Sequence, residues 1–216
     1  MSDATSSPTS RSTPVTVIDA GVGNLGNLRR ALESVGGEVE VTRDPEVVRR
    51  GGILVLPGVG AFKPPREQIR GAMEEALRDA LDGGAHLLGI CVGFQLLFES
   101  SSEFGETDGL GLLPGRVDRL PDTVRLPQIG WNALVERADH ALLRGLGDDP
   151  HFYFVHSWAP VDVPPEARLA QAVHGASFTA VAGRGRVMGT QFHPEKSGPC
   201  GLRLLRNYLE LASWAS

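Results

Sequence analysis

Residues 87–95 read LLGICVGFQ, and this stretch decides which fold is predicted for the whole chain. Its first four residues are continuously apolar, which is typical of a parallel strand buried on both faces of a sheet. Cys91 follows between Gly89 and Gly93, and a helix is expected from Gly93 to about Glu99. A buried strand, a glycine-flanked turn and a helix in this order indicate an α/β fold.

The same alternation of strand and helix extends from this stretch towards the N-terminus. Gly-Gly pairs, which are typical helix stops, follow both of the helices expected there. Apolar runs predict strands at 15–18, 39–42 and 53–56, and helical spacing predicts helices at 27–35 and about 67–81. We therefore expect an open, mostly parallel central sheet with flanking helices.

The second half of the chain has a different residue pattern. Pro-rich and Gly-rich connections separate short strand-like runs, so additional mixed or antiparallel strands are expected there. These runs lie at 111–117, 152–155, 167–173, 178–181 and 187–192, and a last helix is expected at about 201–212. No repeat or linker divides the chain, which indicates one domain over residues 14–216.

Composition excludes several classes of protein. The 216 residues are 41% hydrophobic and 22% charged, which is ordinary for a soluble globular protein. No apolar run approaches the ~20 residues that a membrane-spanning helix needs, so a membrane protein is excluded. The net charge of −5 argues against a nucleic-acid partner, because binding to phosphates requires clustered Lys and Arg.

The N-terminus and the cysteines bear on location. Residues 1–13, MSDATSSPTSRST, are rich in Ser, Thr and Pro and lack the apolar stretch of a signal peptide, so they are expected to form a disordered tail. The two cysteines, Cys91 and Cys200, are too few for a disulfide framework, which favours a reducing cytoplasm.

Cys91 is the candidate nucleophile. With Gly two residues to either side, it matches the Cys form of the strained strand-to-helix elbow that presents a reactive side chain. The N-terminus of the expected helix favours thiolate, because its free N–H groups and dipole are positive. The alternative is a buried cysteine that acts as a small hydrophobe. The surrounding pattern argues against that alternative for Cys91, whereas Cys200 lacks such a frame and is interpreted as a packing residue.

His193 is the candidate base. It follows the expected strand 187–192, at the sheet edge where Cys91 is also expected. A base needs a third group to fix its tautomer, and Glu195 can do so with Pro194 stiffening the link. His156 also ends a strand and is the rival base. The remaining histidines are interpreted as ordinary polar residues: His86, His140, His151 and His174.

The turn Pro57-Gly58-Val59-Gly60 follows another expected strand and is a candidate oxyanion hole. Its glycines allow a peptide to direct its N–H towards the site. A tetrahedral intermediate needs two such donors, and the candidates are the N–H of Val59 or Gly60 and that of Val92. By itself the motif is weak, because Pro-Gly pairs mostly mark plain turns.

Taken together, GICVGFQ (89–95) and HPE (193–195) resemble the triad class of glutamine amidotransferases, whose catalytic set is Cys, His and Glu. Within that class the chain is similar to the glutaminase subunit of imidazole glycerol phosphate synthase. The further segments that carry this similarity are GVGNLGN (21–27), LPGVGAF (56–62), GWN (130–132), YFVHS (153–157) and QFHPEKS (191–197). The resemblance covers nearly all of the chain from Val15 onward and implies a flavodoxin-like sheet.

The resemblance implies hydrolysis of L-glutamine to glutamate and ammonia without a metal or organic cofactor. Ammonia would pass to a (β/α)₈-barrel cyclase subunit in a heterodimer, which forms imidazole glycerol phosphate and AICAR in histidine biosynthesis. It also implies two further sets of residues. Glutamine would be held by Gly58, Gln95, Glu103, Ser157 and Trp158, and the cyclase would be faced by Asn24, Trp131, Asn132 and Lys196. The plainer alternatives are a core position for Trp131 and a helix cap for Asn24.

This chain departs from the family pattern at a few positions. It has Ala20 where the family more often shows the Tyr of DYG, Val92 and Phe94 in place of the Leu and Met of GICLGMQ, and Trp158 in place of the Tyr of HSY. These changes spare the reacting groups, but they leave the contacts of Ala20 and Trp158 open.

The residues predict a thioester mechanism. Cys91 thiolate attacks the glutamine carboxamide, His193 protonates the leaving ammonia, and water assisted by His193 cleaves the thioester. We also expect the 57–60 peptide to flip into its donor position only when the partner is bound and loaded. The alternatives are a free-standing γ-glutamyl hydrolase or another pathway's amidotransferase subunit, and a non-catalytic scaffold, which the complete triad disfavours.

Overall fold

The computed structural model describes residues 12–213. Most of the tail expected at residues 1–13 therefore lies outside the described residues, as do residues 214–216. Strand β1 (Thr13–Ile18) already includes the last residue of that expected tail. Within residues 12–213, no helix is long and apolar enough to cross a membrane.

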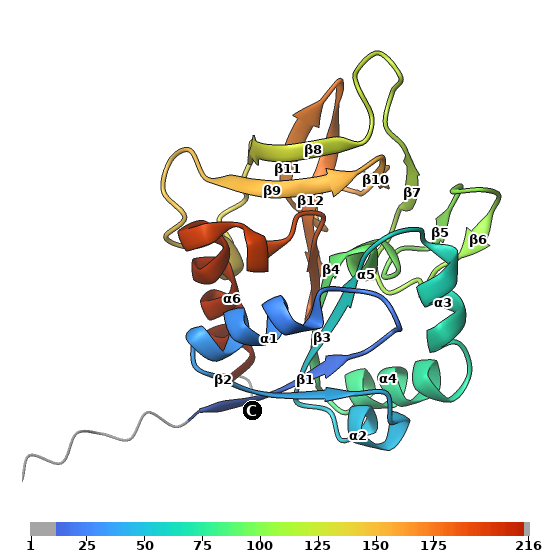
Figure 1. Cartoon of the computed structure of the whole chain (residues 1–216), viewed down its shortest axis with the longest axis vertical. Helices are drawn as coiled ribbons and strands as arrows, with labels where there is room; N and C mark the ends of the chain where they lie inside the picture. The colour runs from blue at the N-terminus through green and yellow to red at the C-terminus, as the bar shows by residue number, and fades with distance from the viewer. Residues whose placement is uncertain (1–11, 214–216) are drawn as a thin grey trace, which may run out of the picture.

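A seven-stranded sheet forms the centre of the molecule, in the order β11-β12-β13-β4-β3-β1-β2 (Figure 1). The five strands from β2 to β13 are parallel, whereas β12 and β11 are antiparallel. The prediction of a mostly parallel sheet with antiparallel strands in the second half is confirmed, and the order β2-β1-β3-β4-β13 is flavodoxin-like. The bounds beyond β1 are β2 (Gly37–Thr42), β3 (Ile53–Gly58), β4 (His86–Cys91), β11 (Arg168–His174), β12 (Ala176–Arg184) and β13 (Val187–Thr190).

Helices cover both faces of this sheet, as the sequence predicted. Helices α1 (Leu25–Ser34) and α6 (Gly198–Ser213) pack together on one face, and α2 (Pro45–Arg49), α3 (Lys63–Ile69) and α4 (Ala72–Asp82) lie on the other (Figure 1). The buried side chains of α4 recur at i, i+3, i+4 and i+7, which gives the helix one apolar face. They are Met73, Ala76, Leu77 and Ala80.

The prediction of one helix over about 67–81 is wrong, because two helices occupy this region. Helix α3 begins earlier, at Lys63, with prolines in its first turn, where their missing N–H groups cost nothing. The helix then ends, because Arg70 has an extended backbone and Gly71 has a φ of 75°, which is accessible mainly to glycine. Helix α4 starts after this break.

The helix expected from Gly93 to Glu99 is also shorter than predicted. Helix α5 (Val92–Gln95) is a single turn. The next backbone carbonyls accept hydrogen bonds from residues 109–113 instead of continuing the helix, for example Leu110 N–H to Leu96 O at 2.8 Å and Gly111 N–H to Phe98 O at 3.0 Å. Long-range hydrogen bonds therefore end this helix.

Two smaller sheets complete the second half. Strands β5 (Ser100–Ser101), β6 (Thr107–Asp108), β7 (Arg116–Arg119) and β10 (Trp158–Val161) form one, and β8 (Gln128–Ala133) pairs antiparallel with β9 (His151–His156) in the other. Single-turn 3₁₀ helices lie at Ala141–Leu143 and Pro194–Lys196. The strand expected at 111–117 begins only at Arg116, β13 ends at Thr190 rather than 192, and β8, β10 and α2 were not predicted.

Candidate active site

Cys91 lies at the carboxyl end of β4 in a strained elbow. Its φ of 55° and ψ of −112° are unfavourable for a residue with a side chain, at a cost of about 1–3 kcal/mol. The flanking glycines make the turn possible. A Cβ on Gly89 would lie 2.7 Å from Phe94 Cα, and one on Gly93 would lie 1.8 Å from Leu56 O. The glycine pattern in the sequence is therefore a packing requirement of this turn.

The structure also accounts for one departure from the family pattern. Phe94 is fully buried, and its ring lies over β13 at Gly189, where an added Cβ would lie 2.1 Å from Phe94 Cδ2. The larger side chain fits because Gly189 has none.

His193 follows β13, whose residue Thr190 pairs with Ile90 of β4 in parallel register. His193 and Cys91 therefore lie at the same edge of the sheet. His193 is 2% exposed, and its Nδ1 lies 2.8 Å from Glu195 Oε1. Its Nε2 is buried and has no hydrogen-bond partner within residues 12–213, and the Cys91 thiol is one of the groups that raise the pKa of His193.

Cys91 and Glu195 both affect the pKa of His193. Burial by itself lowers the pKa of His193, but the interactions with Cys91 and Glu195 outweigh burial and raise that pKa above its usual value. Glu195 is itself almost fully buried, with its side chain 5% exposed, so little solvent screens the pair. The raised pKa keeps the His193 ring available as a proton donor next to the Cys91 side chain.

Two glutamines connect Cys91 to strand β10 through a chain of polar contacts. Gln191 Nε2 lies 3.9 Å from Cys91 Sγ, within hydrogen-bond range for sulfur. Its Oε1 accepts a hydrogen bond from Gln95 Nε2 at 3.1 Å, and Gln95 Nε2 also donates to Trp158 O at 2.8 Å. No role was predicted for Gln191, although it stands only two residues before His193 in the QFHPE motif.

A cavity of about 920 Å³ opens over the elbow. It brings together most of the residues predicted for the site, from both halves of the chain. The predicted residues that line it are Asn24, Val59, Gly60, Cys91, Val92, Gln95, Glu103, Ser157, Trp158, His193 and Lys196. Glu195 lies behind His193, and Trp131 and Asn132 lie on the outer strand β8.

The loop after β3 forms one wall of the cavity. Gly60 has a φ of 86°, and its N–H donates to no residue in the described part of the chain. Val59 lies beside it on the wall and is half-buried. Gly58 is buried behind the wall, where a Cβ would lie 2.6 Å from Gly93 N. Gly58 therefore allows this loop to approach the elbow closely.

Glu103 is buried and also lines the cavity. Its Oε2 accepts a hydrogen bond from Phe62 N–H at 2.7 Å. Burial raises the pKa of the Glu103 carboxyl above its usual value, and the Phe62 N–H offsets only part of this. The adjacent Phe104 also lines the cavity and is 89% exposed, with a positive φ of 55°. No sequence pattern pointed to Phe104.

His156, the rival base, also lines the cavity but lacks an acidic partner. Its Nδ1 lies 3.0 Å from Trp158 O, and its Nε2 is buried and has no hydrogen-bond partner among the described residues. Burial lowers the pKa of His156 to about 4, so the ring is neutral near pH 7. Asp162, the nearest acid in sequence, is exposed and pairs with Arg116 instead.

Of the four residues predicted to face a partner, Asn24 and Lys196 line the cavity, and Trp131 and Asn132 lie on β8. Asn24 caps α1, since its side-chain oxygen accepts a hydrogen bond from Asn27 N–H at 3.1 Å, and it also lines the cavity. Lys196 Nζ lies 5.9 Å from the centre of the Tyr153 ring. Cys200 packs against the hydrophobic core from α6, as the packing interpretation expected.

The outer face of the β8–β9 pair is apolar and exposed. Trp131 is 57% exposed and Ile129 is 65% exposed, so the alternative of a core position for Trp131 is wrong. The Trp131 ring packs edge-on against Tyr153, with centroids 6.2 Å apart. Asn132 Nδ2 donates to Val173 O at 2.9 Å, which joins β8 to β11. Among the described residues, no cluster of three His, Cys, Asp or Glu could hold a metal ion.

Comparisons with known proteins agree with this geometry. The glutamine amidotransferase class-I family matches residues 16–211. Imidazole glycerol phosphate synthase subunit HisH of Symbiobacterium thermophilum is 46% identical over 90% of this chain and 92% of its own length, and that of Salinibacter ruber is 45% identical over 91% and 94%.

Solved structures share the fold. A crystal structure of a glutamine amidotransferase, 25% identical, superposes with a TM-score of 0.72 over 92% of this chain and 98% of its own. PurLQS from Thermotoga maritima, 19% identical, shares the fold with a TM-score of 0.70 over 93% and 99%. The chain therefore belongs to the class-I glutamine amidotransferase family and, within it, to the imidazole glycerol phosphate synthase subunit HisH group.

Proposed function

We propose that this chain is the glutaminase subunit of imidazole glycerol phosphate synthase, with residues 14–216 as its single domain. It hydrolyses L-glutamine to L-glutamate and ammonia, and it supplies the ammonia to a (β/α)₈-barrel cyclase subunit in histidine biosynthesis. The observation that carries this proposal is the buried group of Cys91, His193 and Glu195 at one edge of the sheet. Membership of the HisH group supports the choice of pathway.

The proposed reaction has two steps. Cys91 thiolate attacks the carboxamide carbon of glutamine, and His193 gives its Nε2 proton to the departing nitrogen, so that ammonia leaves and a thioester forms. His193 then takes a proton from water, the resulting hydroxide attacks the thioester, and Cys91 departs as thiolate. Glu195 holds Nδ1 and thereby keeps the proton-transferring nitrogen directed at the sulfur. The steps need no cofactor.

The cavity walls have complementary roles in this proposal. Peptide N–H groups of Val59 or Gly60, and of Val92, stabilise the negative oxygen of the tetrahedral intermediate, each by about 3–4 kcal/mol. Glu103, Gln95 and the backbone at Ser157 and Trp158 hold the amino acid head of glutamine. Gly58 contributes by letting the donor loop approach the elbow.

The partner surface in this proposal lies next to the cavity. Asn24 and Lys196 line the cavity itself, and Trp131 and Asn132 lie on β8, with the Trp131 ring exposed beside Ile129. Exposed aromatic residues are frequent anchors in protein interfaces. The chain forms a heterodimer through this face. Because both cysteines are free thiols, we place the complex in the reducing cytoplasm.

Partner binding also controls the donor loop in this proposal. Gly60 has the conformational freedom for a peptide flip, and its N–H has no partner in the described chain that would resist one. Binding of the loaded cyclase favours the conformation that directs an N–H at the oxyanion. Glutamine is then hydrolysed only when ammonia can be used. Full turnover by the isolated chain would disprove this control.

The proposal is tested by glutamine turnover with and without a barrel cyclase and its nucleotide ligand. Wild type should release glutamate at a rate that rises when both are present, and Cys91→Ala should release none. Cys200→Ala is the matched control and should behave as wild type. Retained activity in Cys91→Ala would overturn the assignment of the nucleophile. Failure of the cyclase to co-purify, with full activity alone, would instead indicate a free-standing hydrolase.

A further inference from the structure

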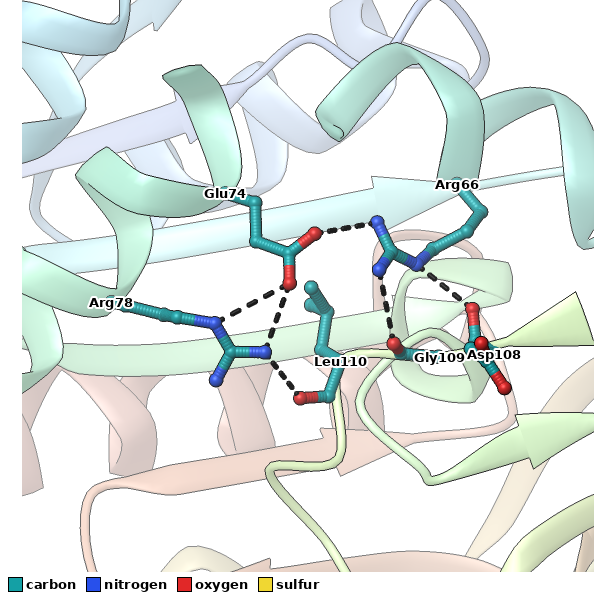
Figure 2. A network of polar contacts seen from close by, with 6 residues as sticks. All are labelled: Arg66, Glu74, Arg78, Asp108, Gly109 and Leu110. Atoms are coloured by element: carbon teal, nitrogen blue, oxygen red, sulfur yellow. Dashed lines mark hydrogen bonds and ion pairs between the residues drawn. The ribbon is translucent and has the colours of Figure 1, made fainter. Parts of the chain in front are cut away.

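A buried arginine ties helix α3 to a distant turn (Figure 2). Arg66 is 6% exposed, and its guanidinium donates to two consecutive backbone carbonyls, Asp108 O at 2.9 Å and Gly109 O at 3.1 Å. Its remaining terminal nitrogen forms an ion pair with Glu74 of α4 at 2.7 Å. One side chain of α3 therefore holds three groups that come from two other segments of the chain.

Glu74 also holds a second arginine. Arg78 pairs with Glu74 at 2.9 Å and donates to Leu110 O at 2.8 Å (Figure 2). Burial by itself raises the pKa of Glu74, but the hydrogen bonds and charges of Arg78 and Arg66 outweigh it and lower that pKa. Glu74 is thus ionised near pH 7. It is the common acceptor that directs both guanidinium groups at the carbonyls of residues 108–110.

Residues 99–109 form a loop, named the excursion, and the anchored turn lies at its C-terminal end. Gly109 N–H donates to Glu99 O at 2.8 Å, so the two ends of the excursion are held together. Glu103 lies between these ends, on the wall of the cavity. Gly109 packs so closely that a Cβ there would lie 2.0 Å from Phe98 O. The turn therefore has little freedom to move while its carbonyls remain anchored.

Helix α3 meets the same excursion at a second point. Phe62, which precedes the first residue of α3, donates its N–H to Glu103 Oε2 at 2.7 Å. Phe62 also stands two residues after Gly60, which lines the cavity. The excursion is thus attached to α3 at both ends of one helical turn, through Phe62 and through Arg66.

Stability alone is a poor explanation for this network. Removing two charges from water costs several kcal/mol per ion, and apolar replacements of buried ion pairs are often as stable. A planar guanidinium fixes the angles between its hydrogen-bond partners. An apolar side chain cannot fix the orientation of its neighbours in this way. The network therefore determines where the turn lies rather than whether the chain folds.

We propose that Arg66 and Glu74 are positioning residues for the glutamine site, which set the place of Glu103 relative to the loop at Val59 and Gly60. The inference rests on the proposed function, since Glu103 is there a ligand of the glutamine head. Without the network, the excursion shifts and the Glu103 carboxylate leaves the place that the amino acid head requires. Cys91, His193 and Glu195 belong to other segments and keep their arrangement.

The test uses Glu74→Gln and Arg66→Lys in the complete complex with the cyclase, in a Cys200→Ala background. Glutamine turnover reports the whole site. Alkylation of Cys91 by iodoacetamide, which has no amino acid head, reports only the reactivity of the thiolate. The matched control is Glu33→Gln, which breaks the exposed pair with Arg29 on α1.

We expect both variants to raise the KM for glutamine about tenfold, which corresponds to about 1.4 kcal/mol. Their alkylation rates should stay within about twofold of the parent, and Glu33→Gln should change neither quantity. An unchanged KM together with a lower melting temperature would overturn the inference and leave a structural role. Slower alkylation would overturn it as well, because the triad itself would be disturbed. If the parent complex has no glutaminase activity, the proposed function fails instead.

Discussion

Two buried histidines, His193 and His156, line the same cavity from the ends of two different strands. His193 has a carboxylate two residues further on, and Glu195 Oε1 lies 2.8 Å from its Nδ1. His156 has Trp158 two residues further on, and its Nδ1 meets a neutral carbonyl at 3.0 Å. Each histidine meets a group two residues further along the chain, but the Glu195 carboxylate is charged and the Trp158 carbonyl is neutral.

The charge of the partner changes what each ring can do. Burial lowers the pKa of both rings, but Cys91 and Glu195 reverse this for His193 and raise its pKa. Nothing comparable offsets burial at His156, whose pKa falls to about 4. In the proposed reaction, a position at a strand end beside the cavity is therefore not enough to make a histidine the base. A buried acid and a thiol are also required.

The largest expected effect comes from removing the imidazole that interacts with the sulfur. In the complex with the cyclase, His193→Asn should lower kcat/KM for glutamine by about 10⁴-fold, because both proton transfers lose their carrier. His156→Asn is the matched control and should cost less than about tenfold, since a neutral ring transfers no proton in the proposed steps. Steady-state release of glutamate measures both. Equal losses would remove the distinction between the two histidines.

A smaller loss is expected when only the orienting acid is neutralised. Glu195→Gln keeps the size of the side chain but removes the charge that raises the pKa of His193 and fixes its tautomer. We expect kcat to fall about 10²-fold, with a KM for glutamine near that of wild type. The rate of Cys91 alkylation against pH should shift in parallel, because less imidazolium stabilises the thiolate. An alkylation profile identical to that of wild type would contradict this account.

The smallest effect concerns stability and belongs to His156. Its pKa is about 4 in the folded chain against 6.5 for an ordinary histidine, so the unfolded chain binds more protons between these values. Its neutral form stabilises the fold fully above pH 6.5, and this contribution is lost as the pH falls towards 4. Between pH 7 and pH 5, wild type should lose about 2 kcal/mol more unfolding free energy than His156→Gln.

Chemical denaturation of the two proteins at both pH values measures this difference. His86 and His140 also have lowered pKa values because of burial, so the comparison with the variant isolates the part that is due to His156. A His156→Gln variant whose stability falls with pH as steeply as that of wild type would show that His156 is not buried in its neutral form.

Local patterns predicted a large part of this molecule. The apolar run before Cys91 and the glycines at 89 and 93 predicted the strand and the elbow, because close packing at that turn excludes any side chain. The HPE motif predicted the contact between His193 and Glu195, since the two residues share one 3₁₀ turn. Each of these features is decided within a few residues of chain.

Other features depend on contacts between distant segments. The helix after Cys91 ends early because backbone N–H groups of residues 109–113 donate to the carbonyls of residues 96–99, which follow the helix, and no local residue signals this. Arg66 anchors carbonyls 42 and 43 residues away, and Gln191 reaches Cys91 across 100 residues. From the sequence alone these looked like ordinary polar residues.

By itself, the sequence determined which residues form the strands of the parallel sheet and which carry sulfur, imidazole and carboxylate, because backbone sterics and apolar periodicity act over short distances. Only the tertiary structure decided which histidine lies beside the Cys91 thiol, and which polar side chains hold distant segments around the cavity together. The physical reason is that pKa values and hydrogen-bond partners depend on burial and on neighbours that the fold brings together from distant parts of the chain.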